Sequence, residues 1–343
     1  MGQYLKNCWY IAAWSHEIST ELLARTLLER KVLLWRASNG VAMAMADRCP
    51  HRFAPLSLGK REGDHVVCAY HGLAFGPDGK CVHNPHGNHS IPTAAKLRTY
   101  PLEERYGAAW IWMGGQDKAD LALIPDFSFL DNEVTRRAVR GQSRLAANYR
   151  IIIDNLMDLS HVEYLHGGTF AVGVMETAKQ TIVQEPGVVT STWWSANVDN
   201  PPLLEKAFAA KGQKVDHWLE MRWQAPTNLR LETGVTLAGR PREEGGGNLQ
   251  AHCLTPESEG STHYFWAMSR TEMLDNEEYS AMIVHVLSTA FDVEDKPMVE
   301  AIQGNMEMEF DDGDVPVLLE IDSAAARAER VLGEMIRSEY ARD

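Results

Sequence analysis

Four residues between positions 49 and 71 have side chains and a spacing suited to holding metal ions. Cys49 and His51 form one close pair, and Cys68 and His71 form a second pair after sixteen intervening residues. Thiolates and imidazoles are the side chains that bind zinc, copper and iron–sulfur clusters in proteins. Each pair offers one sulfur and one nitrogen, so the sequence predicts a metal centre with mixed ligands held between two short loops.

This pattern is typical of a Rieske [2Fe–2S] cluster, in which two imidazoles replace two thiolates on one of the irons. Because imidazole donates less electron density than thiolate, such a cluster has a higher reduction potential than an all-cysteine ferredoxin. The alternative is a structural zinc site, which also takes two cysteines and two histidines. Zinc fingers group the cysteines before the histidines, whereas here each arm has one of each, which favours the cluster and one-electron transfer.

A second group of possible ligands lies on a segment predicted to be helical. Apolar residues recur at helical spacing over residues 145–165, and Asp158, His161 and His166 stand on this segment or directly after it. On an ideal helix the two imidazoles lie on either side of Asp158, about 140° apart. A π-type widening of the helix near residues 161–166 would bring them closer together.

Two histidines and one carboxylate with open coordination positions are the ligands of non-haem iron(II) oxygenases. The spacing does not decide which carboxylate belongs to the site, because Asp154 faces the histidines as well as Asp158 does. A third ligand must come from elsewhere in the chain. An isolated pattern of this kind is more often a helix whose histidines pair with Asp158 and Glu163. The iron–sulfur motif favours the iron site, because oxygen activation at iron requires electrons supplied singly. Candidates for the third ligand are Asp292, Glu294, Asp295 and Glu300.

Composition limits the partners of the chain. The 343 residues include 33 Lys plus Arg and 47 Asp plus Glu, which gives a formal net charge of −14. Such an acidic chain is unsuited to nucleic acid or to an anionic membrane surface, and no apolar run reaches the ~20 residues of a membrane-spanning helix. Five cysteines, two of them assigned to iron, predict free thiols and a cytoplasmic location.

The pattern of the sequence changes near residue 115. Short strand-like runs separated by turn residues fill the part before it, whereas helical and strand-like stretches alternate after it. We therefore predict an α+β protein with an all-β cluster domain over residues 1–115 and a catalytic domain over residues 116–343. In the second domain, strands are expected over residues 181–270 and helices over 145–165, 276–309 and 323–341.

Together the motifs resemble the Rieske non-haem iron oxygenases, in the branch of vanillate O-demethylase, dicamba O-demethylase and toluenesulfonate methyl-monooxygenase. The likeness extends over nearly the whole chain. It is carried by NCWYIAA at 7–13, CPHRFAPLS at 49–57, YHGL at 70–73, CVHNPHG at 81–87, DNLMDLSH at 154–161 and EDK at 294–296.

The resemblance implies which candidates serve as ligands. It selects Asp295 as the third iron ligand and Asp158 as a carboxylate that links His161 to a cluster histidine, and it places Asn155 near the iron. For the second domain it implies an antiparallel sheet with helices in a helix-grip-like arrangement. The implied ligands are Cys49, His51, Cys68 and His71 for the [2Fe–2S] cluster, and His161, His166 and Asp295 for the mononuclear Fe(II).

The resemblance also implies an activity and its partners. A reductase would pass electrons from NAD(P)H, directly or through a ferredoxin, to the cluster. In a head-to-tail homotrimer, Asp158 would then connect His161 to His71 of the partner subunit. The iron site would use O₂ to hydroxylate a methyl or methoxy carbon of the substrate. A plain Rieske electron carrier and a ring-hydroxylating dioxygenase are the alternative functions.

The expected substrate is a small aromatic compound that carries an acidic group. His252 matches a histidine that contacts substrate in the dicamba enzyme, or else is a strand histidine with an internal hydrogen bond. Leu231 and Val286 stand where that enzyme has an amide and an indole, so dicamba is not the expected substrate. Arg230 could pair with a carboxylate or sulfonate. Because side chains alternate along a strand, however, Arg230 would point to the other face of the sheet from Leu231, which favours a solvated position.

Overall fold

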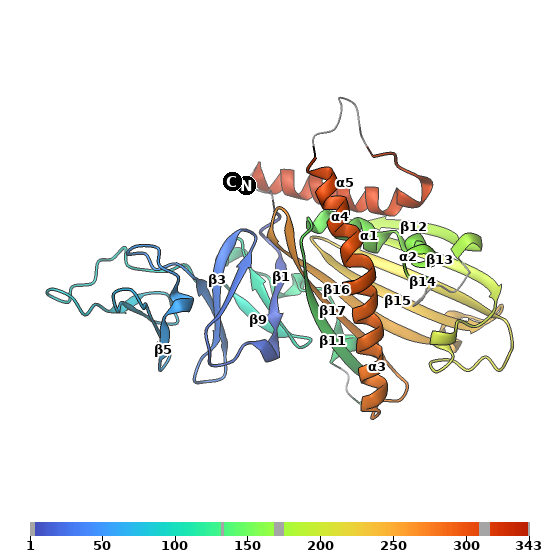
Figure 1. The fold of residues 1–343 in the computed structure, drawn as a ribbon, viewed down its shortest axis with the longest axis horizontal. Coiled ribbons are helices and arrows are strands. Elements are labelled where there is room, and N and C mark those ends of the chain that lie inside the picture. Colours follow the sequence, from blue (N-terminus) through green and yellow to red (C-terminus); the bar gives the residue numbers. More distant parts are fainter. Residues whose placement is uncertain (1–3, 132–133, 168–174, 309–315, 342–343) are drawn as a thin grey trace. The chain divides into compact units, whose positions relative to one another are not determined.

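The structure is a computed structural model that describes residues 4–131, 134–167, 175–308 and 316–341. The chain divides into two compact units (Figure 1). One unit consists of Met1–Ile124 with Thr255–Ser258, and the other of Pro125–Leu254 with Glu259–Asp343. The first is built mainly from strands, and the second from a large antiparallel sheet with helices, which confirms the predicted α+β fold.

Three antiparallel sheets, with strand orders β1-β10-β9, β2-β3-β4 and β5-β6-β7-β8, form the first unit. Its first and last strands pair with each other, with Trp9 opposite Trp112. Both strands are apolar along their whole length and therefore buried on both faces. The indole of Trp9 also donates to the carbonyl of Asp120 at 2.7 Å and ties the residues after 115 to this unit. The strands are β1 (Trp9–Trp14), β2 (Leu23–Leu27), β3 (Arg30–Arg36), β4 (Ala42–Ala46), β5 (Lys60–Glu62), β6 (His65–Val67), β7 (Ala74–Phe75), β8 (Cys81–His83), β9 (Leu102–Arg105) and β10 (Ala108–Trp112).

The two cysteine-containing loops of this unit adjoin its four-stranded sheet. One loop lies between β4 and β5 and the other between β6 and β7. Leu56, Val66 and Phe75 form a buried apolar cluster with Cys49 and Cys68. The two thiols therefore point into an apolar interior, and the sheet fixes the loops from which they project.

A seven-stranded antiparallel sheet forms the second unit, in the order β11-β17-β16-β15-β14-β13-β12. In β14 and β15, Met221 stands opposite Leu231 and Arg222 stands opposite Arg230. Because side chains alternate along a strand, these two pairs face opposite sides of the sheet. The strands are β11 (Arg137–Leu145), β12 (Lys179–Glu185), β13 (Val188–Val198), β14 (Val215–Gln224), β15 (Asn228–Leu237), β16 (Gly246–Ser258) and β17 (Ser261–Arg270).

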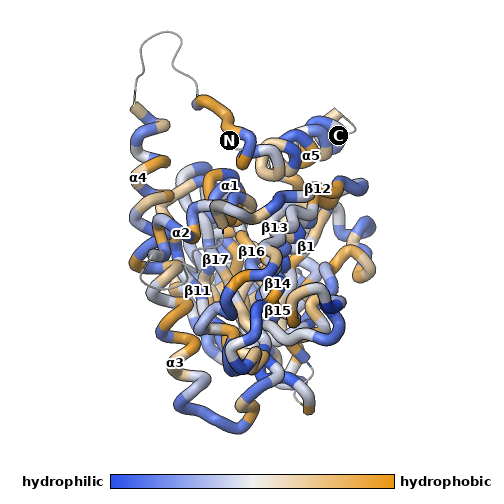
Figure 2. The backbone as a smooth tube through the Cα atoms, turned by 90° about the vertical axis from the view of Figure 1, so that its right-hand side faces the viewer, coloured by the Kyte–Doolittle hydropathy of each residue, from blue (hydrophilic) through white to orange (hydrophobic). Residues whose placement is uncertain are grey.

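Helices pack against this sheet. The side chain of Asn148 caps the first of them by accepting a hydrogen bond from the amide of Arg150 at 2.9 Å. The last helix buries a stripe that includes Ala328, Leu332 and Ile336, and hydrophobic and hydrophilic residues alternate along it in Figure 2. Within the described residues, no helix has the length and apolar character that crossing a lipid bilayer requires. The helices are α1 (Tyr149–Met157), α2 (Val162–Leu165), α3 (Glu277–Ser288), α4 (Lys296–Met306) and α5 (Ser323–Tyr340).

A π-helical segment, Thr289–Asp295, joins α3 to α4 without a break. The amide of Lys296 donates to the carbonyl of Phe291, five residues earlier, as in a π turn. A widening near residues 161–166, which would bring the two histidines together on a continuous helix, does not occur. There the chain forms a 3₁₀ turn (Leu159–His161) followed by α2, because Asp158 ends α1 with an extended backbone conformation.

Candidate active site

Two loops of the first unit present the predicted cluster ligands, and they share one backbone geometry. The amide of Cys49 donates to the carbonyl five residues later at 2.9 Å, and its carbonyl accepts from the amide of Phe53 at 2.8 Å. The loop that begins at Cys68 repeats both bonds, each at 2.9 Å, with Gly72 in the place of Phe53. Phe53 (φ 58°) and Gly72 (φ 69°) both take the left-handed conformation that closes such a loop.

The four side chains of these loops fit a Rieske cluster. The thiols of Cys49 and Cys68 are buried, and neither forms a disulfide. The imidazoles of His51 and His71 lie nearer the surface, with ring centroids 4.6 Å apart. Burial raises the pKa of the Cys49 thiol to about 11, because a thiolate is unfavourable there without positive charge nearby. Two buried sulfurs beside two adjacent imidazoles are the donor set that such a cluster uses.

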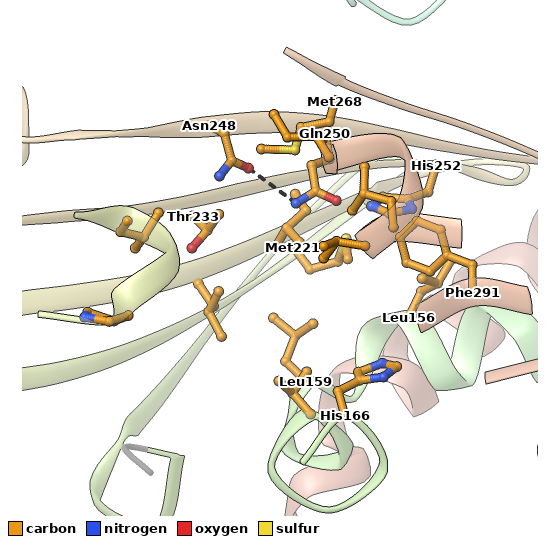
Figure 3. Close-up of a pocket in the computed structure, with 18 of the residues that line it drawn as sticks. Leu156, Leu159, His166, Met221, Thr233, Asn248, Gln250, His252, Met268 and Phe291 are labelled. Atoms are coloured by element: carbon orange, nitrogen blue, oxygen red, sulfur yellow. Dashed lines mark hydrogen bonds between the residues drawn. The ribbon is translucent and has the colours of Figure 1, made fainter. Parts of the chain in front are cut away.

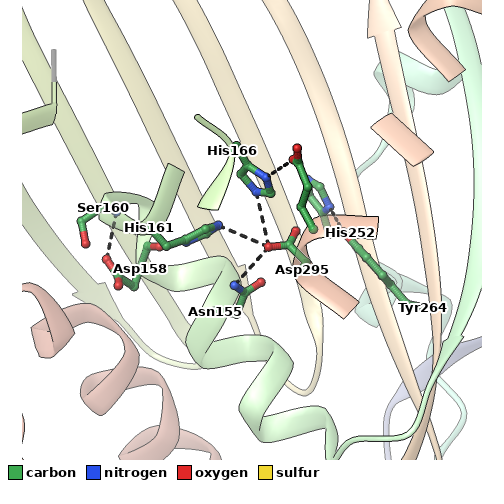
Figure 4. A network of polar contacts seen from close by, with 9 residues as sticks. Asn155, Asp158, Ser160, His161, His166, His252, Tyr264 and Asp295 are labelled. Atoms are coloured by element: carbon green, nitrogen blue, oxygen red, sulfur yellow. Dashed lines mark hydrogen bonds and ion pairs between the residues drawn. The ribbon is translucent and has the colours of Figure 1, made fainter. Parts of the chain in front are cut away.

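The second unit brings Asp295 together with two histidines, His161 and His166, that lie far from it in the sequence. Donor atoms of His161, His166 and Asp295 all lie within 4.8 Å of one another. Asp295 Oδ1 is 3.6 Å from His161 Nε2 and 3.3 Å from His166 Nε2 (Figure 4), and the Asn155 amide donates to the same oxygen at 3.4 Å. Two imidazole nitrogens and a carboxylate oxygen around one point are the donors of the facial triad, so these residues fit a mononuclear iron ion.

A break in the helix positions the two histidines. α1 ends at Met157, Asp158 has φ −95° and ψ 92°, and the chain then re-enters helical conformation. The angular spacing of an ideal helix therefore does not apply beyond Asp158, and the rings of His161 and His166 come within 5.2 Å of each other, centroid to centroid. Asp295 is supplied from the opposite direction, as the last residue of the π segment.

Each histidine of the group has a polar partner on its second ring nitrogen. His166 Nδ1 is 2.7 Å from Glu294 Oε2, and His161 Nδ1 contacts the backbone carbonyl of Asp158. Such partners hold a proton on Nδ1 and leave the Nε2 lone pair for a metal. Burial acts to lower the pKa of His166, but hydrogen bonds and charge from Asp295 and Glu294 outweigh burial and raise it.

The carboxylate of Asp158 does not contact His161, which corrects the expected link. One carboxylate oxygen, Oδ1, accepts a hydrogen bond from the amide of Ser160 at 2.9 Å and so caps the 3₁₀ turn. The free amides at the start of a helical turn attract an acceptor of this kind. The contact with His161 is made by the backbone carbonyl of Asp158 instead.

The other carboxylates that spacing left open as ligands have different partners. Asp292 accepts a hydrogen bond from the hydroxyl of Ser143, and Glu300 accepts one from the amide of Ala146 at 2.7 Å. Asp154 is not part of the group of donor atoms found among the described residues. The structure thus brings Asp295, and none of these three, into reach of both imidazoles.

Replacing Glu294 by glutamine is expected to weaken iron binding by roughly 10- to 100-fold, because the imidazole of His166 loses its anionic partner. The measurement is iron retention during competition with a chelator, with the visible absorption of the cluster as an internal reference. Glu278→Gln, at an exposed position of α3, is the matched control and should retain iron like the wild type. Equal retention by Glu294→Gln would contradict this role.

A cavity opens beside the three clustered side chains, between the sheet and the helices (Figure 3). Its volume is about 170 Å³, counted as space open to the centre of a water molecule. A cavity of ~150 Å³ holds a benzene ring, so a small aromatic fits. Leu231, Val286 and His252, all predicted to contact substrate, line the cavity, and Asn248 and Gln250 line it as well.

Arg230 lies on the other face of the sheet. It lines a separate hollow together with Asp126, Arg222 and Asn228. Adjacent residues of a strand point to opposite faces of the sheet, so the side chain of Leu231 points into the cavity and that of Arg230 points away from it. An ion pair between Arg230 and a molecule bound in the cavity is therefore excluded, and of the two positions that the sequence left open Arg230 has the one that strand alternation favoured, away from the cavity.

Two buried histidines of the cavity wall are uncharged. Burial lowers the pKa of His252 and of His217 to about 4 in each case. His252 Nδ1 is 2.6 Å from the hydroxyl of Tyr264, so this histidine has the internal hydrogen bond that the sequence left open. His217, Asn248 and Gln250 were not predicted as part of the site. The alternation of polar residues at 248, 250 and 252 within an apolar strand is the signal that could have found two of them.

Two known protein families match separate parts of the chain. Residues 8–101 match the Rieske [2Fe-2S] domain, and residues 145–338 match the vanillate O-demethylase oxygenase C-terminal domain. The chain belongs to the Rieske oxygenases of the vanillate O-demethylase family. This Rieske oxygenase is therefore an oxidoreductase, as the two groups of metal-binding side chains predicted.

Relatives of this Rieske oxygenase align over nearly their full length. The oxygenase component of chloroacetanilide N-alkylformylase from Rhizorhabdus wittichii is 40% identical over 98% of this chain and 97% of its own. The oxygenase component of dicamba O-demethylase from Stenotrophomonas maltophilia is 34% identical over 98% and 99%, respectively.

Solved structures agree with these relatives. The crystal structure of dicamba monooxygenase bound to 3,6 dichlorosalicylic acid matches 99% of this chain and 100% of that chain, with a TM-score of 0.93 and 34% identity. A second structure of that enzyme, with non-heme iron and dicamba, has a TM-score of 0.86 at 34% identity and covers both chains fully. Together with the His/His/Asp group, these matches confirm a Rieske cluster and a mononuclear iron as the cofactors.

Proposed function

We propose that this Rieske oxygenase is the terminal component of a multicomponent monooxygenase that hydroxylates a methyl, methoxy or N-alkyl carbon of a small aromatic compound. The observation that carries the proposal is the group of His161, His166 and Asp295 in the wall of a mostly apolar cavity. The named relatives support it, since they include an O-demethylase and an N-alkylformylase. A plain electron carrier would need neither the cavity nor the second group of ligands.

We assign one metal centre to each of the two groups of metal-binding side chains. The cluster domain, residues 1–115, would hold the [2Fe–2S] centre, and the catalytic domain, residues 116–343, would hold Fe(II) through His161, His166 and Asp295. Asn155 would restrain the Asp295 carboxylate through the hydrogen bond to Oδ1. The cluster ligands are Cys49, His51, Cys68 and His71.

The proposed reaction places one atom of O₂ on the substrate carbon and reduces the other to water, with two electrons from NAD(P)H. When bound, the cluster supplies these electrons singly and the ferrous ion supplies the site where O₂ is reduced. A hydroxylated methoxy carbon breaks down to a phenol and formaldehyde, whereas a hydroxylated methyl carbon remains an alcohol. The chain orients His161 and His166 through their Nδ1 partners. Apolar side chains around the cavity keep water from the reacting carbon.

We propose that the enzyme is a homotrimer in which the cluster of one subunit supplies electrons to the iron of its neighbour. Asp158 would form the junction, because its Oδ1 caps the 3₁₀ turn while Oδ2 has no hydrogen-bond partner among the described residues. Oδ2 would accept a hydrogen bond from a ring N–H of His71 of the partner subunit. The path would continue to His161 through the backbone carbonyl of Asp158.

The electron donor would be a separate NAD(P)H-dependent reductase, acting directly or through a ferredoxin. The relatives named as oxygenase components support this expectation. A cytoplasmic location would supply both NAD(P)H and reducing conditions for the cysteines, none of which forms a disulfide. 

The proposal is tested by metal content and product formation on the purified chain. We expect about three irons and two acid-labile sulfides per chain with a Rieske EPR signal, because the two sites are separate. About two irons would indicate an electron carrier instead, and zinc without sulfide a structural site. Oxygen uptake with release of formaldehyde from a panel of aryl methyl ethers, in the presence of a reductase, would demonstrate the activity. A dihydrodiol product would indicate ring dioxygenation and contradict the proposed reaction.

A further inference from the structure

We infer that the cavity of this Rieske oxygenase selects an uncharged aromatic substrate with an oxygen acceptor, such as an amide or an ether, over an aromatic carboxylate or sulfonate. The inference rests on the proposed function, because it concerns the substrate of the same site. It departs from the acidic substrate that the family resemblance implied. The residues that decide the selectivity are Asn248 and Gln250.

The lining of the cavity lacks cationic side chains. No lysine or arginine lines it among the described residues. Of the residues outside the described part, only Arg342 is basic, and the segment 168–174 reads GTFAVGV. Arg230 lies on the opposite face of the sheet. An anionic substrate would therefore lose its hydration on entering the cavity without gaining a cationic partner.

The charge of a bound ferrous ion does not replace that partner. Two carboxylates, Asp295 and Glu294, stand at the site, and Glu294 reaches His166 Nδ1 at 2.7 Å. Their two negative charges balance the two positive charges of Fe(II). The metal site thus exerts little net attraction on a further anion.

The polar groups of the cavity are neutral and come mainly from one strand. Asn248, Gln250 and His252 occupy alternate positions of β16 and therefore face the same side, with 9%, 9% and 2% of their surface exposed (Figure 3). Gln250 donates to Asn248 Oδ1 at 3.2 Å, which leaves the Asn248 amide protons without a partner among the described residues. His252 Nε2 is likewise buried without a hydrogen-bond partner in that part of the chain.

These groups match an uncharged acceptor. The 2.6 Å contact allows the Tyr264 hydroxyl to donate to His252 Nδ1, and in that tautomer the ring proton is on Nε2, where it can donate to a ligand oxygen. The Asn248 amide is a second donor, and the carbonyl oxygen of Gln250 is an acceptor. A carboxamide satisfies both donors and acceptor, whereas a carboxylate of the same shape places negative charge against the Gln250 oxygen. Buried donors left unpaired are unfavourable, so an oxygen-bearing ligand is preferred to a pure hydrocarbon.

The test compares para-methoxybenzamide with para-methoxybenzoate, which share a shape but differ in charge. Binding to the iron-loaded enzyme is measured by calorimetry without O₂, so that turnover does not contribute. We expect the amide to bind at least about tenfold more tightly, which corresponds to ~1.4 kcal/mol. Equal or tighter binding of the benzoate would overturn the inference. So would failure of both the amide and uncharged para-methylanisole to bind at about 1 mM.

A variant tests the part assigned to Gln250. Gln250→Leu is expected to weaken binding of the amide on the order of tenfold and to leave para-methylanisole within about twofold, because only the polar contact is lost. Gln184→Leu, the same change at an exposed position of β12, is the matched control and should bind both ligands like the wild type. Unchanged amide affinity in Gln250→Leu would remove Gln250 from the selectivity. The wild-type comparison stands whether or not this variant folds.

The inference and the proposed function fail in different ways. Release of formaldehyde from the benzoate in preference to the amide would keep the proposed function and overturn the inference. Absence of the mononuclear iron would overturn the proposed function, and the amide and the benzoate titrated into the chain as purified would still measure the charge preference of the cavity.

Discussion

Asp295→Ala is expected to abolish turnover while the visible spectrum of the Rieske cluster persists. The substitution removes the carboxylate that lies within 3.6 Å of one imidazole and 3.3 Å of the other. Without it, two neutral imidazoles remain to hold a divalent ion, and Glu294 is already engaged by His166. We expect iron to fall by about one per chain and the coupled rate to fall by at least roughly a thousandfold.

The comparison variant is Asp292→Ala, which changes a carboxylate of the same π segment. Asp292 is exposed and bonds to Ser143 rather than to a ligand, so iron content and turnover should remain near wild type. Iron and acid-labile sulfide are measured together on both variants. Loss of the cluster absorption in Asp295→Ala, with the third iron retained, would show that the ligands have been divided wrongly between the two centres.

Asp158→Asn is expected to retain both metal centres and to lose turnover by roughly a hundredfold or more. Asparagine caps a helical turn about as well as aspartate, so the hydrogen bond from the Ser160 amide is preserved. The contact with His161 comes from the backbone and is also kept. What the variant loses is the negative charge proposed to join the iron site to the cluster of the partner subunit.

Metal analysis and stopped-flow spectroscopy separate these effects. The cluster of Asp158→Asn should be reduced by dithionite as in the wild type, and its reoxidation by O₂ in the presence of substrate should be slowed. Asp154→Asn changes a carboxylate on the same stretch of chain that is outside the metal group, and it should turn over normally. Wild-type NADH-driven activity in Asp158→Asn would rule out the junction.

The chemistry of this site was more predictable than its geometry. Few residue types bind iron, so cysteine and histidine in close pairs were visible in the sequence. The helical arithmetic for His161 and His166 was not reliable, because Asp158 caps a new turn and ends α1. A cap of this kind competes locally with continuation of a helix, and the competition is decided by tertiary packing.

The third ligand and the cavity wall depended on the long-range structure. Asp292, Asp295 and Glu300 lie within nine positions of one another, and only the π turn determines which of them reaches the histidines. Strand alternation did predict that Arg230 and Leu231 face opposite ways. It could not tell which face the helices cover, and Asn248 and Gln250 were missed for that reason.

The π segment has a consequence for how this enzyme can change its substrate. α3 supplies cavity residues, among them Ile283 and Val286, and the wide turn separates them from Asp295. A π turn amounts to one extra residue in a helix. Side chains on α3 can therefore be exchanged one by one while the carboxylate keeps its place. Deleting a single residue from Thr289–Asp295 would instead rotate α3 by about 100° against the iron ligand. Point mutations in α3, upstream of the π turn, can thus change the substrate specificity in evolution or protein engineering. Insertions or deletions in the π segment would instead displace the cavity residues relative to the iron ligand.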